Sequence, residues 1–203
     1  MDTTSKVNYS KLMEQALQSI GDKKPLLLLH CCCAPCSTHV LDVLCEHFKV
    51  LIHFANPNIY PQEEYNKRLN ELYRYIDAAK PGNIAGFIAD DYSHEQFLNA
   101  VKGLESEPEG GARCAVCFKL RLESAARAAK EAGAEYFTTT LTVSPHKNAA
   151  VLNTTGLELA GKYGIEFLCS DFKKHDGYKH SIQLCAQYGI YRQSYCGCEF
   201  SVK

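Results

Sequence analysis

Cysteines are the residues of this chain best suited to chemistry, since all but three of its 11 cysteines lie in tight groups. Thiolates separated by two residues can bind one metal from a single turn. Two such pairs supply the four ligands of a zinc ion or an iron–sulfur cluster. The odd number of cysteines also excludes complete pairing into internal disulfides. The groups are Cys31, Cys32, Cys33 and Cys36, then Cys114 and Cys117, and finally Cys196 and Cys198.

The first two groups could hold either a structural zinc or a cluster, because both centres accept pairs of thiolates at this spacing. We favour a cluster, since a chain of 203 residues can bury a core of its own and needs no metal to fold. Adjacent thiolates such as Cys32 and Cys33 also chelate a single ion poorly, whereas they can bind different irons of a cluster.

Two pairs of cysteines could instead act as redox dithiols. Cys33 and Cys36 have the spacing of a thioredoxin-like pair at the start of a helix, where backbone amides stabilise a thiolate. Cys196 and Cys198 are separated by one residue, and a disulfide between them would close a small, strained and easily reduced ring. The alternative for this second pair is that it supplies two further metal ligands.

Composition and charge narrow the class of protein. The chain has 22 Lys and Arg residues against 23 Asp and Glu, so its net charge of −1 offers no general attraction for nucleic acid. The N-terminus lacks the apolar segment of a secretory signal. The apolar run 26–29 is far shorter than the roughly 20 residues that cross a bilayer. We therefore expect a cytoplasmic protein with no membrane partner.

Short apolar segments alternate with helical patterns along the chain, which predicts an α/β fold. We expect a Rossmann-like, parallel, five-stranded sheet flanked by helices. Residues 25–203 would form one catalytic iron–sulfur domain, and residues 1–24 an N-terminal helical extension with a helix over 9–20. The predicted strands are 26–29, 50–55, 84–89, 136–141 and 165–168. The predicted helices are 37–48, 63–79, one from about 93, one opened by Cys114 and Cys117, and one from Ser144-Pro145 to about 163.

Several polar residues follow the predicted strands directly. The carboxyl ends of parallel strands share one edge of the sheet, where ligands bind, so we expect these side chains near the first cysteine group. They are His30, Asn56, Asp90, Thr142 and Asp171. The loop 56–61, rich in proline and asparagine, is expected to be functional.

A basic and aromatic segment near the C-terminus could bind RNA, because cations hold phosphates and aromatic rings stack on unpaired bases. A solvated surface explains its composition equally well. The candidate phosphate contacts are Lys173, Lys174, Lys179 and Arg192, and the candidates for stacking are Tyr191 and Tyr195.

Together these motifs resemble one known family, the epoxyqueuosine reductases of the QueH type. The resemblance spans nearly all of the chain after Pro25. It rests on HCCCAPCS (30–37), NPNIYP (56–61) with Glu64-Tyr65 and Arg68, PEGGARCAVC (108–117) with Arg121-Leu122, LTVSPHKN (141–148), SDFKK (170–174) and YRQSYCGCEFS (191–201).

The resemblance implies an enzyme that removes the epoxide oxygen of epoxyqueuosine at the tRNA wobble position. It implies a [4Fe–4S] cluster bound by Cys32, Cys33, Cys114 and Cys117, although Cys31 leaves open which two of the three consecutive cysteines are ligands.

It further implies an additional iron held by cluster thiolates and an aspartate, which we expect to be Asp90 or Asp171, and a redox-active pair formed by Cys196 and Cys198. The expected partners are tRNA and an external electron donor. We expect the substrate to be bound by Asn56, Tyr60, Lys173, Lys174, Lys179, Tyr191 and Arg192.

Two other functions use the same residues. A thiol–disulfide oxidoreductase built on Cys33/Cys36 and Cys196/Cys198 would be active without iron. A zinc-stabilised RNA-binding module would use the four thiolates for structure alone.

Overall fold

Five parallel strands form the centre of the protein in a computed structural model that describes residues 7–201. The strand order is β3-β2-β1-β4-β5, the order of a Rossmann-type sheet. The predicted α/β class and parallel five-stranded sheet are therefore confirmed. The strands are β1 Leu26–His30, β2 Lys49–Phe54, β3 Ile84–Ala89, β4 Tyr136–Thr139 and β5 Glu166–Phe167.

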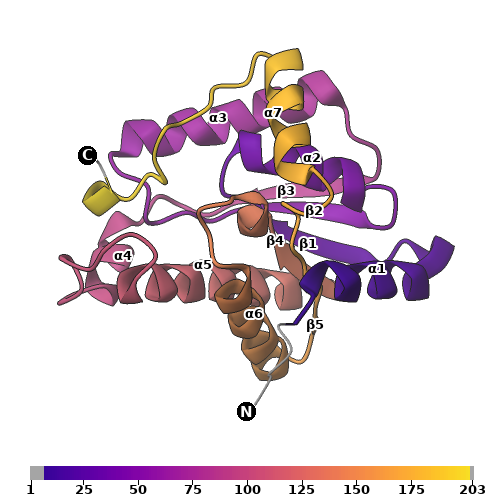
Figure 1. Ribbon diagram of the computed structural model, residues 1–203, viewed down its shortest axis with the longest axis horizontal. Coiled ribbons are helices and arrows are strands. Elements are labelled where there is room, and N and C mark those ends of the chain that lie inside the picture. The colour runs from indigo at the N-terminus through magenta and orange to yellow at the C-terminus, as the bar shows by residue number, and fades with distance from the viewer. Residues whose placement is uncertain (1–6, 202–203) are drawn as a thin grey trace, which may run out of the picture.

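Helices cover both faces of this sheet (Figure 1): α2, α3 and α7 pack on one side, and α5 and α6 on the other. Side chains alternate along a strand, so Leu27 and Leu29 of β1 enter one core and Leu28 enters the other. The helices are α1 Tyr9–Ile20, α2 Ala34–Leu44, α3 Gln62–Ala79, α4 His94–Ala100, α5 Ala112–Glu131, α6 Ala149–Tyr163 and α7 Gly177–Gln187.

Helix α1 has the predicted bounds and packs on the sheet domain. Its apolar stripe of Met13, Leu17 and Ile20 is buried in the same core as α2 and α3. Residues 1–6 of the predicted extension lie outside the described part of the chain. Within residues 7–201, no helix combines the length and hydropathy that a membrane span requires.

Two helix starts differ from the sequence-based expectation. Helix α2 begins at Ala34 rather than 37, because Pro35 is accommodated in a first helical turn, so Cys36 lies on the helix. Ser144-Pro145 does not begin a helix. The Asn148 side chain caps α6 instead, accepting hydrogen bonds from the backbone N–H groups of Ala150 (2.9 Å) and Val151 (3.3 Å).

The chain between β4 and α6 also differs, because the strand predicted over 136–141 ends at Thr139. The Thr139 Oγ1 accepts a hydrogen bond from the Leu141 N–H at 3.1 Å, which turns the chain into the 3₁₀ helix Thr140–Val143. Helix α7 was not predicted at all.

Gly156 of α6 allows the helix to approach β5 closely. A Cβ atom at this position would overlap the ring of Phe167, whereas one at Gly161 of the same helix would meet open space. We expect Gly156→Ala to lower the free energy of unfolding by about 1–3 kcal/mol. Gly161→Ala should leave it unchanged or raise it by up to about 1 kcal/mol. Chemical denaturation of both variants tests this, and equal effects would contradict it.

Candidate active site

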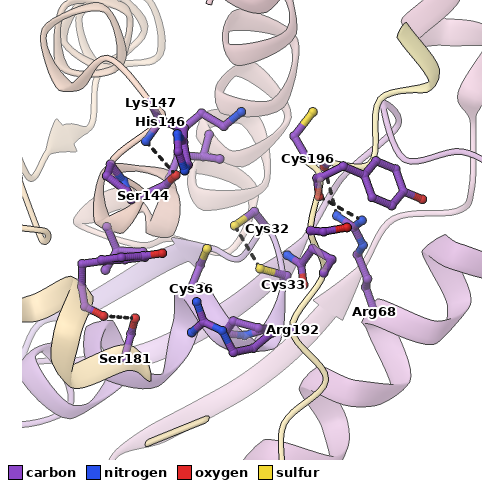
Figure 2. Close-up of a pocket in the computed structure, with 18 of the residues that line it drawn as sticks. Cys32, Cys33, Cys36, Arg68, Ser144, His146, Lys147, Ser181, Arg192 and Cys196 are labelled. Atoms are coloured by element: carbon purple, nitrogen blue, oxygen red, sulfur yellow. Dashed lines mark hydrogen bonds between the residues drawn. The ribbon is translucent and has the colours of Figure 1, made fainter. Parts of the chain in front are cut away.

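The first cysteine group places three sulfurs around one point. The Sγ atoms of Cys32, Cys33 and Cys36 lie within 4.8 Å of one another, and those of Cys32 and Cys33 are 3.6 Å apart. Strand β1 leads into the first two residues, and the first turn of α2 turns the third toward them, as Figure 2 shows.

A cavity of about 770 Å³ opens above these thiols. It lies where the strand order reverses, because its walls come from the segments after β1 and β4, the position at which Rossmann-type sheets bind ligands. The C-terminal segment and α7 complete the walls with Tyr178, Arg192 and Cys196. The volume falls in the range of roughly 300–1,000 Å³ typical of small-molecule sites.

The thiols of this group have different pKa values. Hydrogen bonds from Cys33 and Cys36 hold the pKa of Cys32 well below its usual range, against the effect of burial, and the positive charge of Arg121 adds to them. Donating to Cys32 raises the pKa of Cys33 to about 12. One thiolate with two adjacent thiols is a soft donor set, so these residues fit a thiolate-bound iron or zinc centre.

The second cysteine group begins helix α5, as expected. Cys114 Sγ accepts a hydrogen bond from the Gly110 N–H at 3.2 Å, and Cys117 is buried in a small apolar cluster with Cys198. Among the His, Cys, Asp and Glu side chains of residues 7–201, only those of Cys32, Cys33 and Cys36 bring three ligand atoms within 4.8 Å of one another. The structure therefore does not bring Cys114 and Cys117 into that group, and their role as ligands stays a prediction.

Cys196 and Cys198 are free thiols in this structure. A hydrogen bond from Cys198 lowers the pKa of Cys196 to about 5, and the Lys147 ammonium and Ser201 hydroxyl reinforce this effect. Donating that bond raises the pKa of Cys198. Cys196 lines the cavity (Figure 2), so a thiolate with an adjacent thiol faces the same space as the first cysteine group.

Helix α3 fixes the backbone around this pair. The buried Arg68 donates from Nη1 to the Cys196 carbonyl oxygen at 3.0 Å and from Nε to Glu64 at 2.7 Å. Gly197 has a φ of 99°, and a Cβ atom there would lie 2.9 Å from Arg68 Nη1. The Tyr60 N–H in the loop 56–61 donates to the Gly197 carbonyl at 2.9 Å. This loop therefore supports the C-terminal cysteine segment.

The two aspartates follow strands as predicted, but neither lines the 770 Å³ cavity. Asp90 accepts hydrogen bonds from His53 Nε2 at 2.8 Å and Ser124 Oγ at 2.7 Å, and it lines a separate cavity of about 350 Å³. Asp171 forms an ion pair with Lys173 at 2.6 Å. Their assignment to a second metal stays a prediction.

The predicted substrate-binding residues differ in accessibility. Arg192 lines the cavity and is exposed, as are Tyr60, Lys174 and Lys179. Lys173 is half-buried in its ion pair with Asp171. Tyr191 is also half-buried, with the Lys67 ammonium 3.5 Å from its ring centroid.

Asn56 is buried rather than exposed. Its Nδ2 donates to the Cys31 carbonyl at 3.0 Å, so Asn56 holds the backbone of the first cysteine group in place. Sequence reasoning assigned no role to Arg68, Arg121 or Lys147. Only their places in the family-like motifs could have indicated them, since the contacts that bring them to the site are with distant residues: Arg68 with Cys196, Arg121 with Asn56 and Lys147 with Glu109.

Comparison with known proteins places the chain in a family. A family description named "Epoxyqueuosine reductase QueH" matches residues 27–203. The relative from Streptococcus pyogenes serotype M1 is 42% identical over 208 residues, covering 100% of this chain and 81% of the relative. That from Staphylococcus epidermidis is 42% identical over 202 residues (97% and 85%), and that from Thermotoga maritima is 36% identical over 182 residues (87% and 90%). All three are named epoxyqueuosine reductase QueH, so the chain belongs to the QueH family of oxidoreductases.

Proposed function

We propose that this protein reduces the epoxide of epoxyqueuosine at the tRNA wobble position to give queuosine. The observation that carries the proposal is the 770 Å³ cavity, which has the volume of a small-molecule site. The Cys196 thiolate and the three-sulfur group of Cys32, Cys33 and Cys36 both line it. The family membership supplies the substrate.

The reaction needs two electrons and two protons, because the epoxide becomes an alkene and its oxygen leaves as water. Oxidation of the Cys196 thiolate and the Cys198 thiol to a disulfide releases two electrons and one proton, and solvent supplies the second proton. Their free thiols and the low pKa of Cys196 support this role. An external electron donor must then reduce the disulfide before the next turnover.

The proposed cofactors are a [4Fe–4S] cluster held by Cys32, Cys33, Cys114 and Cys117 and an additional iron. When bound, this centre transfers single electrons and supplies a Lewis acid for the epoxide oxygen. The Lys147 side chain is only 11% exposed, lines the cavity and pairs with Glu109 at 3.4 Å, and its remaining N–H groups can donate to an anionic oxygen there.

The aspartate that holds the second iron can be identified by substitution. We expect Asp→Ala at either Asp90 or Asp171 to abolish turnover while leaving the visible absorption of the cluster intact, because the carboxylate binds only the additional iron. Full activity in both variants would contradict the proposed second site.

Lys174 and Lys179 are exposed on and beside α7, which supports a role in contacting tRNA phosphates. We expect Lys174→Glu combined with Lys179→Glu to weaken tRNA binding. The slope of log K against log salt concentration should fall by about two, roughly one for each lysine. Lys130→Glu, on the opposite side of the sheet, is the matched control. Unchanged affinity in the double variant would place the RNA surface elsewhere.

The proposed function can be tested in a bacterium that lacks its own epoxyqueuosine reductases. Expression of this chain should convert tRNA epoxyqueuosine to queuosine, seen by mass spectrometry as the loss of one oxygen atom. Accumulation of epoxyqueuosine despite soluble expression would contradict the proposal.

A thiol–disulfide oxidoreductase is the second candidate, favoured by the acidic thiol of Cys196 beside Cys198. It predicts reduction of disulfide substrates by protein from which all metal has been removed. The reductase proposal predicts no conversion of epoxyqueuosine by the same metal-free protein.

A further inference from the structure

Arg121 lines the thiol cavity yet is only 5% exposed. Its Nη2 donates a hydrogen bond to Asn56 Oδ1 at 2.5 Å, whereas its Nε has no hydrogen-bond partner. Within the part of the chain that the structure describes, Arg121 forms no salt bridge with any carboxylate. A permanently charged guanidinium is therefore buried without a paired carboxylate.

Such an arrangement is costly unless a negative charge lies nearby, because a buried cation loses its hydration. The Glu109 carboxylate in the cavity wall pairs with Lys147, so the remaining groups of the cavity that can supply negative charge are thiolates. Arg121 lines the same cavity as Cys32 and Cys33. It is one helical turn beyond Cys117 on α5, so the two side chains lie on the same face of the helix.

Asn56 orients the Arg121 guanidinium without neutralising the charge of that guanidinium. Asn56 donates from Nδ2 to the Cys31 carbonyl at 3.0 Å while its Oδ1 accepts from Arg121, so it connects the first cysteine loop to α5. A neutral amide holds the guanidinium in place, whereas an aspartate would neutralise it.

We propose that Arg121 is the built-in counter-charge of the cysteine centre and that it raises the reduction potential of the iron bound there. The inference rests on the proposed function for the identity of the bound group. Its physical basis is that reduction adds negative charge to a cluster, which a buried cation stabilises. Arg121 is a positioning residue in this role, since it acts through the thiolates.

The test is a redox titration of the iron-containing protein, purified without oxygen and free of tRNA. The visible spectrum reports the fraction of the iron centre that is reduced at each potential. We expect Arg121→Met and Asn56→Asp to shift the midpoint potential to more negative values, because each removes net positive charge from the same buried position. Arg121→Lys should stay closer to the wild-type potential. Lys119→Met is the matched control, because Lys119 is an exposed cation on the same helix whose charge water screens, and it should show no shift.

The iron content of each variant is measured together with its potential. It distinguishes an effect of charge on the potential from loss of the metal site. Wild-type potentials in iron-loaded Arg121→Met and Asn56→Asp would overturn the inference. Iron lost from Arg121→Met but kept by Arg121→Lys would support it, whereas equal loss from both would indicate a merely structural role and overturn it. A charge-dependent potential in a protein that fails to convert epoxyqueuosine would contradict the proposed function and leave this inference standing.

Discussion

Cys32→Ser is expected to release the bound iron and to lower turnover by more than about 100-fold, beyond the 10–100-fold loss typical of changes around metal ligands. Cys32 receives hydrogen bonds from both neighbouring thiols and is the thiolate of the three-sulfur group. A serine hydroxyl keeps nearly the same size but is a much weaker ligand for iron, so the centre should not assemble.

Iron and sulfide analysis with visible absorption, on protein purified without oxygen, measures this effect. Cys169→Ser is the matched control, because Cys169 is an isolated cysteine outside the three groups, and it should keep its iron. A Cys32→Ser variant with the full iron content would contradict the assignment. Zinc in place of iron in the wild-type protein would favour the structural-zinc interpretation.

Cys196→Ser is expected to lower multiple turnover by about 100-fold or more, the scale on which loss of a catalytic group slows a reaction. The variant cannot form the disulfide whose formation delivers the two electrons. Its iron content should remain that of the wild type, because Cys196 is not one of the four proposed cluster ligands.

The measurement is queuosine formed per enzyme with excess tRNA and reductant, alongside iron analysis. Cys185→Ser serves as control, since Cys185 is buried between α7 and the core. If Cys196→Ser loses iron as completely as Cys32→Ser, then Cys196 is a ligand rather than a redox thiol.

Most of the fold could be predicted because the strands are short apolar segments separated by regular helices. The bounds of α1 and β3 agree with the prediction to the residue. Helix α7 was missed because it begins among lysines and histidines and buries few apolar side chains. Its close packing depends on Gly177, where a Cβ atom would collide with Phe172 and His39. Contacts of that kind leave no periodic signal in the sequence.

The site could be predicted only in outline. Spacing correctly grouped Cys36 with Cys32 and Cys33, but it did not show that α2 begins at Ala34 and carries Cys36 on its first turn. Placement after a strand correctly put Asp90 at the carboxyl end of the sheet. It could not show that His53 and Ser124 hold the carboxylate in a different cavity. The contacts of Arg68 with the Cys196 segment link residues more than one hundred positions apart, which no local pattern encodes.

The central claim is tested most directly by a single-turnover reaction. Purified, iron-loaded and fully reduced protein is mixed in excess with tRNA that carries epoxyqueuosine, without oxygen and without an added electron donor, and the nucleosides are quantified by mass spectrometry. The proposed function predicts conversion to queuosine with concurrent loss of the Cys196 and Cys198 free thiols. Unchanged epoxyqueuosine in the presence of the iron-loaded, reduced protein would contradict it.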